Sequence, residues 1–166
     1  MRWWEGVVVL LAALAAAGAF FAAWATQRAA EAQLLLELLN DYAMPEMAEA
    51  LRTLRAWLAV KGDEFANEWE LALARNEPAA AAVDDARHRV TSYFRNADEL
   101  CQVGMISKRT ARAAVDKQGL PVLITICAPL ERRLDPRVNL GFVRRLRALC
   151  PHRRDLITPV PTSMPE

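Results

Sequence analysis

The chain of 166 residues has little of what most catalytic and metal sites are built from, with six glycines, two histidines and three cysteines. It contains no G-x-S-x-G, G-x-G-x-x-G or Walker A motif, so the loops that cradle phosphates or expose a nucleophilic serine are missing. The histidines, His88 and His152, lie far apart, and neither belongs to an H-E-x-x-H or E-x-x-H pair. The sequence therefore predicts no catalytic residue, no metal site and no cofactor, and the protein is expected not to be an enzyme.

Disulfide and zinc patterns are also missing. Cys101, Cys127 and Cys150 are odd in number and widely spaced, and no C-x-x-C pair occurs. All three lie in apolar patterns, where cysteine acts as a small buried hydrophobe. We therefore expect reduced thiols in the core, which favours a reducing compartment.

Charge is absent from one long stretch. Residues 6 to 25 read GVVVLLAALAAAGAFFAAWA and contain no ionisable side chain. In a helix these residues span about 30 Å, the thickness of the hydrocarbon core of a bilayer. Trp3 and Trp4 precede the run and Trp24 lies near its end, which suits indole rings at the two headgroup levels. Residues 1–26 are therefore predicted to be a transmembrane anchor.

Two other interpretations of this segment stay open. Arg2 and the motif Ala23-Trp24-Ala25 fit a cleaved signal peptide, although the apolar run is longer than usual and tryptophan is unusual within a cleavage motif. The third interpretation is a buried core helix, which rarely runs so far without a polar position. The orientation of the span is not decided by the positive charges beside it, because Arg2 and the terminal amine on one side nearly balance Arg28 on the other. The thiols and the basic C-terminal half favour a cytoplasmic location for the domain.

Helix-forming residues continue beyond the membrane segment, and residues 27–40 are predicted to form a stalk on the same helix. An apolar stripe at helical spacing marks this stalk, made of Leu34, Leu35, Leu38 and Leu39. The stripe either packs on its own domain or serves as an interface with a second copy or a partner.

Residues 41–150 are predicted to form an antiparallel helical bundle, so that the whole chain is all-α with about five or six helices. Pro45 suits the first position of a helix that Gly62 ends, and Asp63 is expected to cap the next one. The clearest helix runs from Pro78 to about Val103, where apolar residues recur by threes and fours. Its solvated face is expected to carry His88, Asp84, Asp85, Arg87, Arg95, Asp98 and Glu99.

The last third of the bundle is less regular. Ser107 is expected to cap a short helix that ends at Gly119. The β-branched run Val122 to Ile126 has no hairpin partner, so it is interpreted as a buried helix that is kinked or broken at Pro129. Asn139 is expected to cap a final amphipathic helix.

The charge of the chain is unevenly distributed. Residues 26–100 carry 8 Lys and Arg against 14 Asp and Glu, a net charge of −6, whereas residues 101–166 carry 12 against 5, a net charge of +7. The basic half gathers most of its arginines in one patch, made of Arg132, Arg133, Arg137, Arg144, Arg145, Arg147, Arg153 and Arg154.

Several explanations of this patch stay open. It could be a solvated surface that answers the acidic half, within the domain or between copies. It could also contact anionic lipid, or recognise an acidic or phosphate-bearing partner. Nucleic acid is disfavoured, because no aromatic platform or helix-turn-helix signature accompanies the arginines.

One stretch resembles a known family. Residues 87–100, RHRVTSYFRNADEL, followed by VGMIS over 103–107, resemble a helix and turn of an uncharacterised bacterial domain-of-unknown-function family of small proteins with one N-terminal membrane helix. Pro129 to Arg133 matches a later segment of that family with a proline and basic residues. The likeness covers roughly residues 5–150, implies a single-pass protein of the bacterial inner membrane, and transfers no catalytic residue. The Pro-rich residues 151–166 depart from the pattern and are predicted to be a disordered tail.

These features predict a non-enzymatic, single-pass membrane protein whose helical domain binds a protein partner or assembles with itself at the membrane. The alternative is a module that binds anionic lipid or phosphate through the basic C-terminal helix.

Overall fold

The computed structural model describes residues 3–151, apart from the side chain of Glu5. All regular structure in that range is helical, and no strand occurs in it. The elements are α1 (Trp3–Ala43), α2 (Pro45–Lys61), η1 (Gly62–Glu64), α3 (Phe65–Ala74), α4 (Pro78–Gln102), α5 (Lys108–Val115), α6 (Gly119–Val122), η2 (Leu123–Cys127), α7 (Ala128–Leu134) and α8 (Gly141–Leu149). The predicted all-α fold is confirmed. The expected tail, apart from Pro151, lies outside the described residues.

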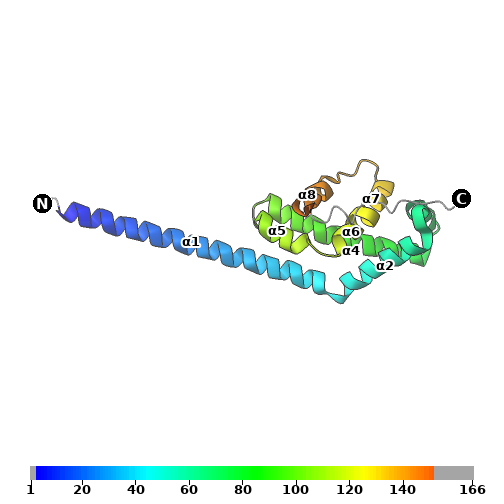
Figure 1. Cartoon of the computed structure of the whole chain (residues 1–166), viewed down its shortest axis with the longest axis horizontal. Helices are drawn as coiled ribbons and strands as arrows, with labels where there is room; N and C mark the ends of the chain where they lie inside the picture. The colour runs from blue at the N-terminus through cyan, green and yellow to red at the C-terminus, as the bar shows by residue number, and fades with distance from the viewer. Residues whose placement is uncertain (1–2, 152–166) are drawn as a thin grey trace.

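A single helix, α1, joins the apolar segment to the domain. It is 41 residues long and reaches Ala43, three residues beyond the expected end at Asn40. Met44 then takes an extended conformation, which the following proline favours, and Pro45 opens α2 as predicted. The first half of α1 projects from the domain as a free rod, whereas its second half lies along the domain (Figure 1).

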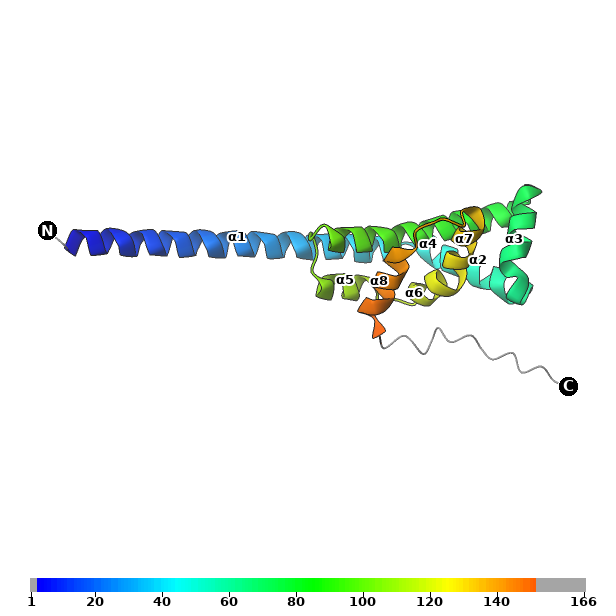
Figure 2. The same cartoon turned by 90° about the horizontal axis from the view of Figure 1, so that it is seen from above.

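The other helices form an antiparallel bundle around the second half of α1. Helix α2 continues away from the rod, α3 crosses the far end of the domain, and α4 returns beside α2 towards the rod (Figures 1 and 2). The segments from α5 to α8 then cover the side of α4 that α1 and α2 leave open. The turn between α4 and α5 is consequently the end of the domain nearest to the free rod.

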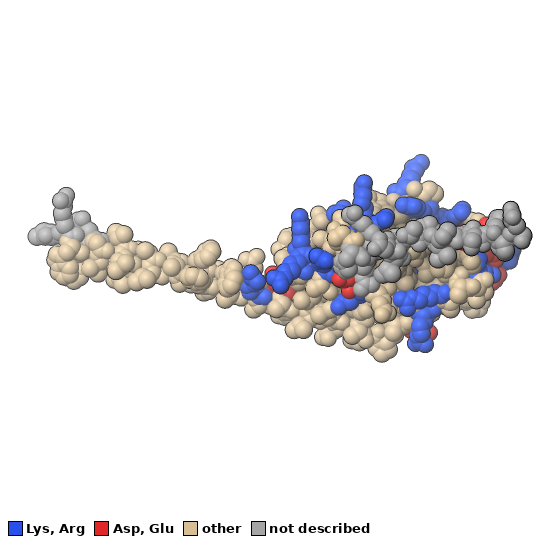
Figure 3. All heavy atoms as spheres, in the orientation of Figure 1, with Lys and Arg blue, Asp and Glu red and all other residues tan. Residues whose placement is uncertain are grey.

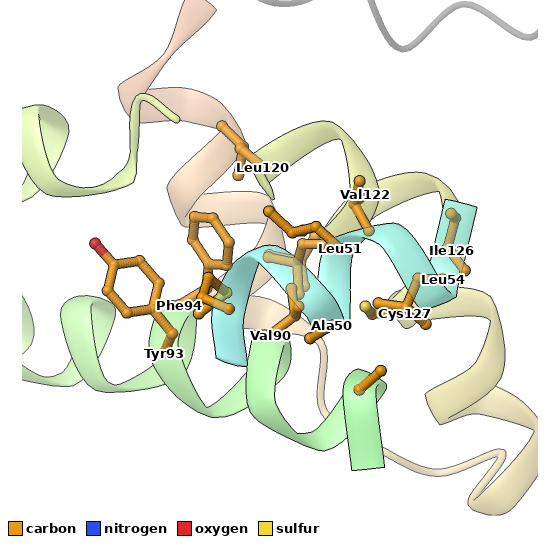
Figure 4. Close-up of a cluster of buried hydrophobic side chains, with 14 of the residues drawn as sticks. Ala50, Leu51, Leu54, Val90, Tyr93, Phe94, Leu120, Val122, Ile126 and Cys127 are labelled. Atoms are coloured by element: carbon orange, nitrogen blue, oxygen red, sulfur yellow. The ribbon is translucent and has the colours of Figure 1, made fainter. Parts of the chain in front are cut away.

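The core lies where α2, α4 and the segment from α6 to η2 meet. Figure 4 shows their side chains pointing toward one another, with Leu54 of α2, Phe94 of α4 and Ile126 of η2 among them. Trp69 of α3 closes the far end, and its indole N–H donates to the carbonyl of Ala80 at 3.2 Å. Because α1 contributes Leu38 to the same cluster, the stalk is a structural part of the domain.

Of the kink or break predicted at Pro129, the break is wrong, although the segment is helical as expected. Helical geometry runs from Gly119 to Leu134, with a π turn over Leu123–Cys127 directly ahead of the proline. The amide of Ala128 bonds to the carbonyl of Leu123, five residues earlier. A π turn of this kind makes room for a proline ring that would otherwise strike the preceding turn. The helix therefore widens before Pro129 and continues through it.

Helix ends follow the sequence signals in part. The hydroxyl of Ser107 accepts the amide of Thr110 at 3.2 Å, as a capping residue does. Asp63, in contrast, lies inside the 3₁₀ turn η1 and caps nothing. Helix α5 ends at Val115, and Gly119 begins the next element rather than ending this one. Asn139 accepts the amide of Gly141 at 2.8 Å, but Leu140 occupies the capping position.

Candidate functional site

The free rod is the first feature that calls for a function. Among the described residues, α1 is the one helix long and apolar enough to cross a membrane, and its apolar window buries nothing inside the structure. Trp3 and Trp4 stack with ring centroids 4.4 Å apart at its start. At the other end the guanidinium of Arg28 lies 4.9 Å from the ring centroid of Trp24. Exposed apolar surface of this extent has to be covered by something other than the domain itself.

The second half of α1 behaves differently, because it is bonded to the domain at three levels. The carboxylate of Glu31 accepts bonds from Ser107 and Thr110, Asp41 pairs with Arg89 at 2.6 Å, and the hydroxyl of Tyr42 accepts the amide of Gly119 at 2.9 Å. Between these levels the stripe packs inward: Leu38 is buried, Leu34 and Leu35 pack against the core, and Leu39 is half-buried. Of the two alternatives for the leucine stripe of the stalk, the structure shows the first, in which the stripe packs on its own domain.

The Glu31 contact is the one nearest the rod. The amide of Ser107 donates to Oε1 of Glu31 at 2.7 Å, and the Thr110 hydroxyl donates to the same oxygen. These hydrogen bonds, with a smaller contribution from the charge of Arg28, lower the pKa of Glu31 from 4.5 to about 2. The start of α5 is therefore held against α1 by a carboxylate that stays ionised at neutral pH. The sequence analysis did not identify Glu31. Its position as the first carboxylate after the apolar run is the signal that could have identified it.

The basic patch of the sequence divides into two parts in the structure. Six of its arginines are exposed on α7, α8 and the loop between them. Arg145 is paired with Asp98, and we call the other five the arginine face: Arg132, Arg133, Arg137, Arg144 and Arg147. Arg133 lies 3.8 Å from Glu70 in an exposed contact, while the side chains of Arg132, Arg144 and Arg147 form no ion pair within residues 3–151. Figure 3 shows Lys and Arg gathered on this side of the domain. Arg153 and Arg154 lie outside the described residues.

Arg145 belongs to the patch in sequence but has a structural role. Its guanidinium donates to both oxygens of Asp98, at 2.5 and 3.1 Å, and these bonds raise its pKa. Asp98 is only 2% exposed, so the expectation that it faces solvent is wrong. A carboxylate buried this deeply needs a charged partner, and the arginine that supplies it holds α8 onto α4.

A buried ion pair corrects the expectation for Arg87. This arginine was expected on the solvated face of α4 but is 6% exposed. It forms ion pairs with Glu131 of α7 and with Asp84 at 2.8 Å, and its guanidinium lies 5.9 Å from the ring centroid of Trp69. The pair joins α4 to α7 through the interior. His88 is exposed, as expected.

The interior of the domain contains the thiol of Cys127. Burial raises the pKa of the Cys127 thiol to about 12, so this cysteine stays protonated and unreactive at neutral pH. Within residues 3–151 all three cysteines are free, and no group of three or more His, Cys, Asp and Glu is placed to hold a metal ion.

Comparisons of the chain with family models, with curated proteins and with solved structures found no match. The resemblance of residues 87–107 to a family of bacterial membrane proteins therefore stays a prediction. Two surfaces of the described residues stay uncovered, the apolar half of α1 and the arginine face.

Proposed function

We propose that this chain is a single-pass membrane protein that holds a helical domain at the cytoplasmic surface and presents its arginine face to an acidic protein partner. The observation that carries the proposal is the division of α1. Its first half is apolar and uncovered over the length of a bilayer core, and its second half is built into the domain.

Retention of the segment is favoured over cleavage by the conformation of the cleavage motif. Ala23-Trp24-Ala25 lies inside a regular helix that runs on without interruption to Ala43. Three free thiols and the basic residues beside the apolar segment support a cytoplasmic location for the domain. In a bacterium this corresponds to the inner membrane.

The arginine face supports the choice of an acidic partner. Arginines without a carboxylate partner present planar donor groups that match carboxylates, and α7 and α8 hold them on short, ordered helices. A second copy of the chain is one candidate partner: a groove of about 700 Å³ between α2 and α4 is lined by Glu46, Glu49 and Asp85, and also by Arg52, which pairs with Glu49, and by Arg89.

The test is photo-crosslinking of the full chain in its native membrane from a reactive amino acid at position 137. We expect a crosslinked product that Arg144→Glu/Arg147→Glu reduces at least tenfold and that high salt weakens. The control Arg75→Glu changes an exposed arginine away from the arginine face and should leave the product intact. A chain that is monomeric in detergent and crosslinks to nothing would exclude both a partner and self-assembly.

A further inference from the structure

The turn between α4 and α5 exposes two large apolar side chains at the end of the domain nearest the rod. Val103 is 69% exposed and Met105 is 59% exposed, on either side of Gly104. Gly104 has a φ of 77°, which a glycine adopts without strain and which reverses the chain at this point. The pair is therefore displayed at the tip of a tight turn, where contact with water is unfavourable.

The height of this turn along α1 follows from the Glu31 contact. Ser107 is bonded to Glu31, and Met105 lines a hollow with Gln27, Ala30 and Leu34 of α1. Glu31 is six residues beyond Ala25, the end of the apolar run, which is about 9 Å along a helix. Each headgroup region of a bilayer is about 5–8 Å thick. If α1 spans the bilayer, Glu31 consequently lies just outside the headgroup region, whereas Gln27 and Ala30, which line the same hollow as Met105, lie within it, about 3 and 8 Å beyond Ala25.

Basic residues surround the turn. Lys108 and Arg109, the first residues of α5, are exposed and form no ion pair within residues 3–151. Arg28 lies on α1 at the same end. Figure 3 shows Lys and Arg where the domain meets the rod, and Figures 1 and 2 both place the turn on that side. The arginine face lies on α7 and α8 and is a different surface.

We propose that this end of the domain is a second membrane contact, which we call the headgroup contact, made of Val103, Met105, Lys108, Arg109 and Arg28. Its ligand is the anionic surface of the same leaflet that α1 leaves. The apolar pair enters the interfacial region, the cations meet lipid phosphates, and the Glu31 contact holds the turn at the required height. The inference rests on the proposed anchoring, which positions the turn against the bilayer.

The test uses the full chain reconstituted into vesicles, with a fluorescent label at a single accessible cysteine. Gln102→Cys places the label next to the turn without changing Val103 or Met105, and Val60→Cys places it at the far end of the domain, where Val60 is 78% exposed. Cys101, which is half-buried, is replaced by serine in both chains. The vesicles contain three parts phosphatidylcholine to one part phosphatidylglycerol and a lipid whose headgroup carries a spin-label quencher.

We expect strong quenching at position 102 and little at position 60. Lys108→Glu/Arg109→Glu should lower the quenching at position 102 severalfold, as should vesicles of phosphatidylcholine alone, because cations near an anionic surface are attracted to it. The matched change Arg144→Glu/Arg147→Glu should leave it unchanged.

Flotation of the vesicles tests the anchoring by α1 separately from the headgroup contact. A chain that fails to float with the vesicles overturns the anchoring and this inference with it. A chain that floats but shows equal quenching at positions 102 and 60 overturns the headgroup contact alone. Equal quenching at position 102 in neutral vesicles, or an equal loss in the Arg144→Glu/Arg147→Glu chain, also overturns the assignment to these cations.

Discussion

The two halves of α1 belong to one regular helix, yet they meet opposite surroundings. The first half has no polar side chain between residues 6 and 25 and touches nothing in the domain, whereas the second half is bonded through Glu31, Asp41 and Tyr42. Helix propensity is similar in both, so it does not account for the difference. The polar groups that reach neighbouring helices account for the difference, because they fit the second half to the domain, whereas the first half has no such groups and stays uncovered.

The strongest way to break this comparison is to put charge in the first half. Leu10→Arg/Leu14→Arg places two cations in the middle of the span, each unfavourable by about 3 kcal/mol, and should release the chain from the membrane. Leu36→Arg, at a 61% exposed position of the second half, should have no effect on attachment. Alkaline extraction of membranes measures both variants. Attachment that survives the double change would show that the first half does not anchor the chain.

The second half should respond to loss of packing instead. Leu38 is 4% exposed, so Leu38→Ala should lower the free energy of unfolding of the domain by about 2–4 kcal/mol while the chain stays attached to the membrane. Leu36→Ala, two residues earlier, should change it by less than about 0.5 kcal/mol. Urea unfolding of the full chain in detergent, followed by near-ultraviolet circular dichroism, compares the two. Equal losses would mean that burial does not distinguish these positions.

A smaller effect is expected at the end of α1. Tyr42→Phe removes the oxygen that accepts the Gly119 amide and should lower the free energy of unfolding by about 1 kcal/mol. Thr26→Val removes a hydrogen bond of similar length, 2.9 Å, that lies within α1 and joins nothing to the domain. The same urea titration should show little change for this variant. A Tyr42→Phe domain as stable as the wild type would mean that the bond adds nothing to docking.

The smallest effect is local and depends on pH. The pKa of Glu31 is lowered, so its bonds to Ser107 and Thr110 are complete above about pH 4.5 and are lost as the pH falls through about 2. The amide of Ser107 should lose protection from hydrogen exchange in that window, relative to the Thr110 amide, which bonds to the Ser107 hydroxyl instead. In Glu31→Gln the Ser107 amide should exchange faster at neutral pH and show no change over that window. Protection that is independent of both pH and this substitution would contradict the contact.

Positions within single elements could be predicted from the sequence, and pairings between elements could not. The length of the apolar run, Pro45 at the start of α2 and the cap at Ser107 each depend on a few neighbouring residues. Asp98 and Arg145, in contrast, are 47 residues apart, and both have charged neighbours that point to water. Periodicity assigned them to exposed surfaces because charge is the usual mark of a solvated face.

Contacts between elements also explain why the candidate surfaces in the structure differ from those predicted from the sequence. The arginine patch was visible as composition, but the pairing of Arg145 with the buried carboxylate of Asp98 required the packing of α8 on α4. The headgroup contact combines residues from α1, from the turn between α4 and α5, and from α5, and no local pattern joins them. Pro129 shows the opposite error, since a strong local signal for a break was overridden by a π turn inside a buried helix.

Because α1 is uninterrupted, the number of residues between Ala25 and Glu31 determines how the domain is oriented around the helix axis. If α1 anchors the chain as we propose, the absence of a flexible linker between Ala25 and Glu31 fixes the orientation of the domain relative to the bilayer. Removing one residue from this interval would swing the whole domain by about 100° around the axis and draw it about 1.5 Å closer to the lipid. The number of residues in this interval would then determine the direction in which the arginine face points in the plane of the membrane.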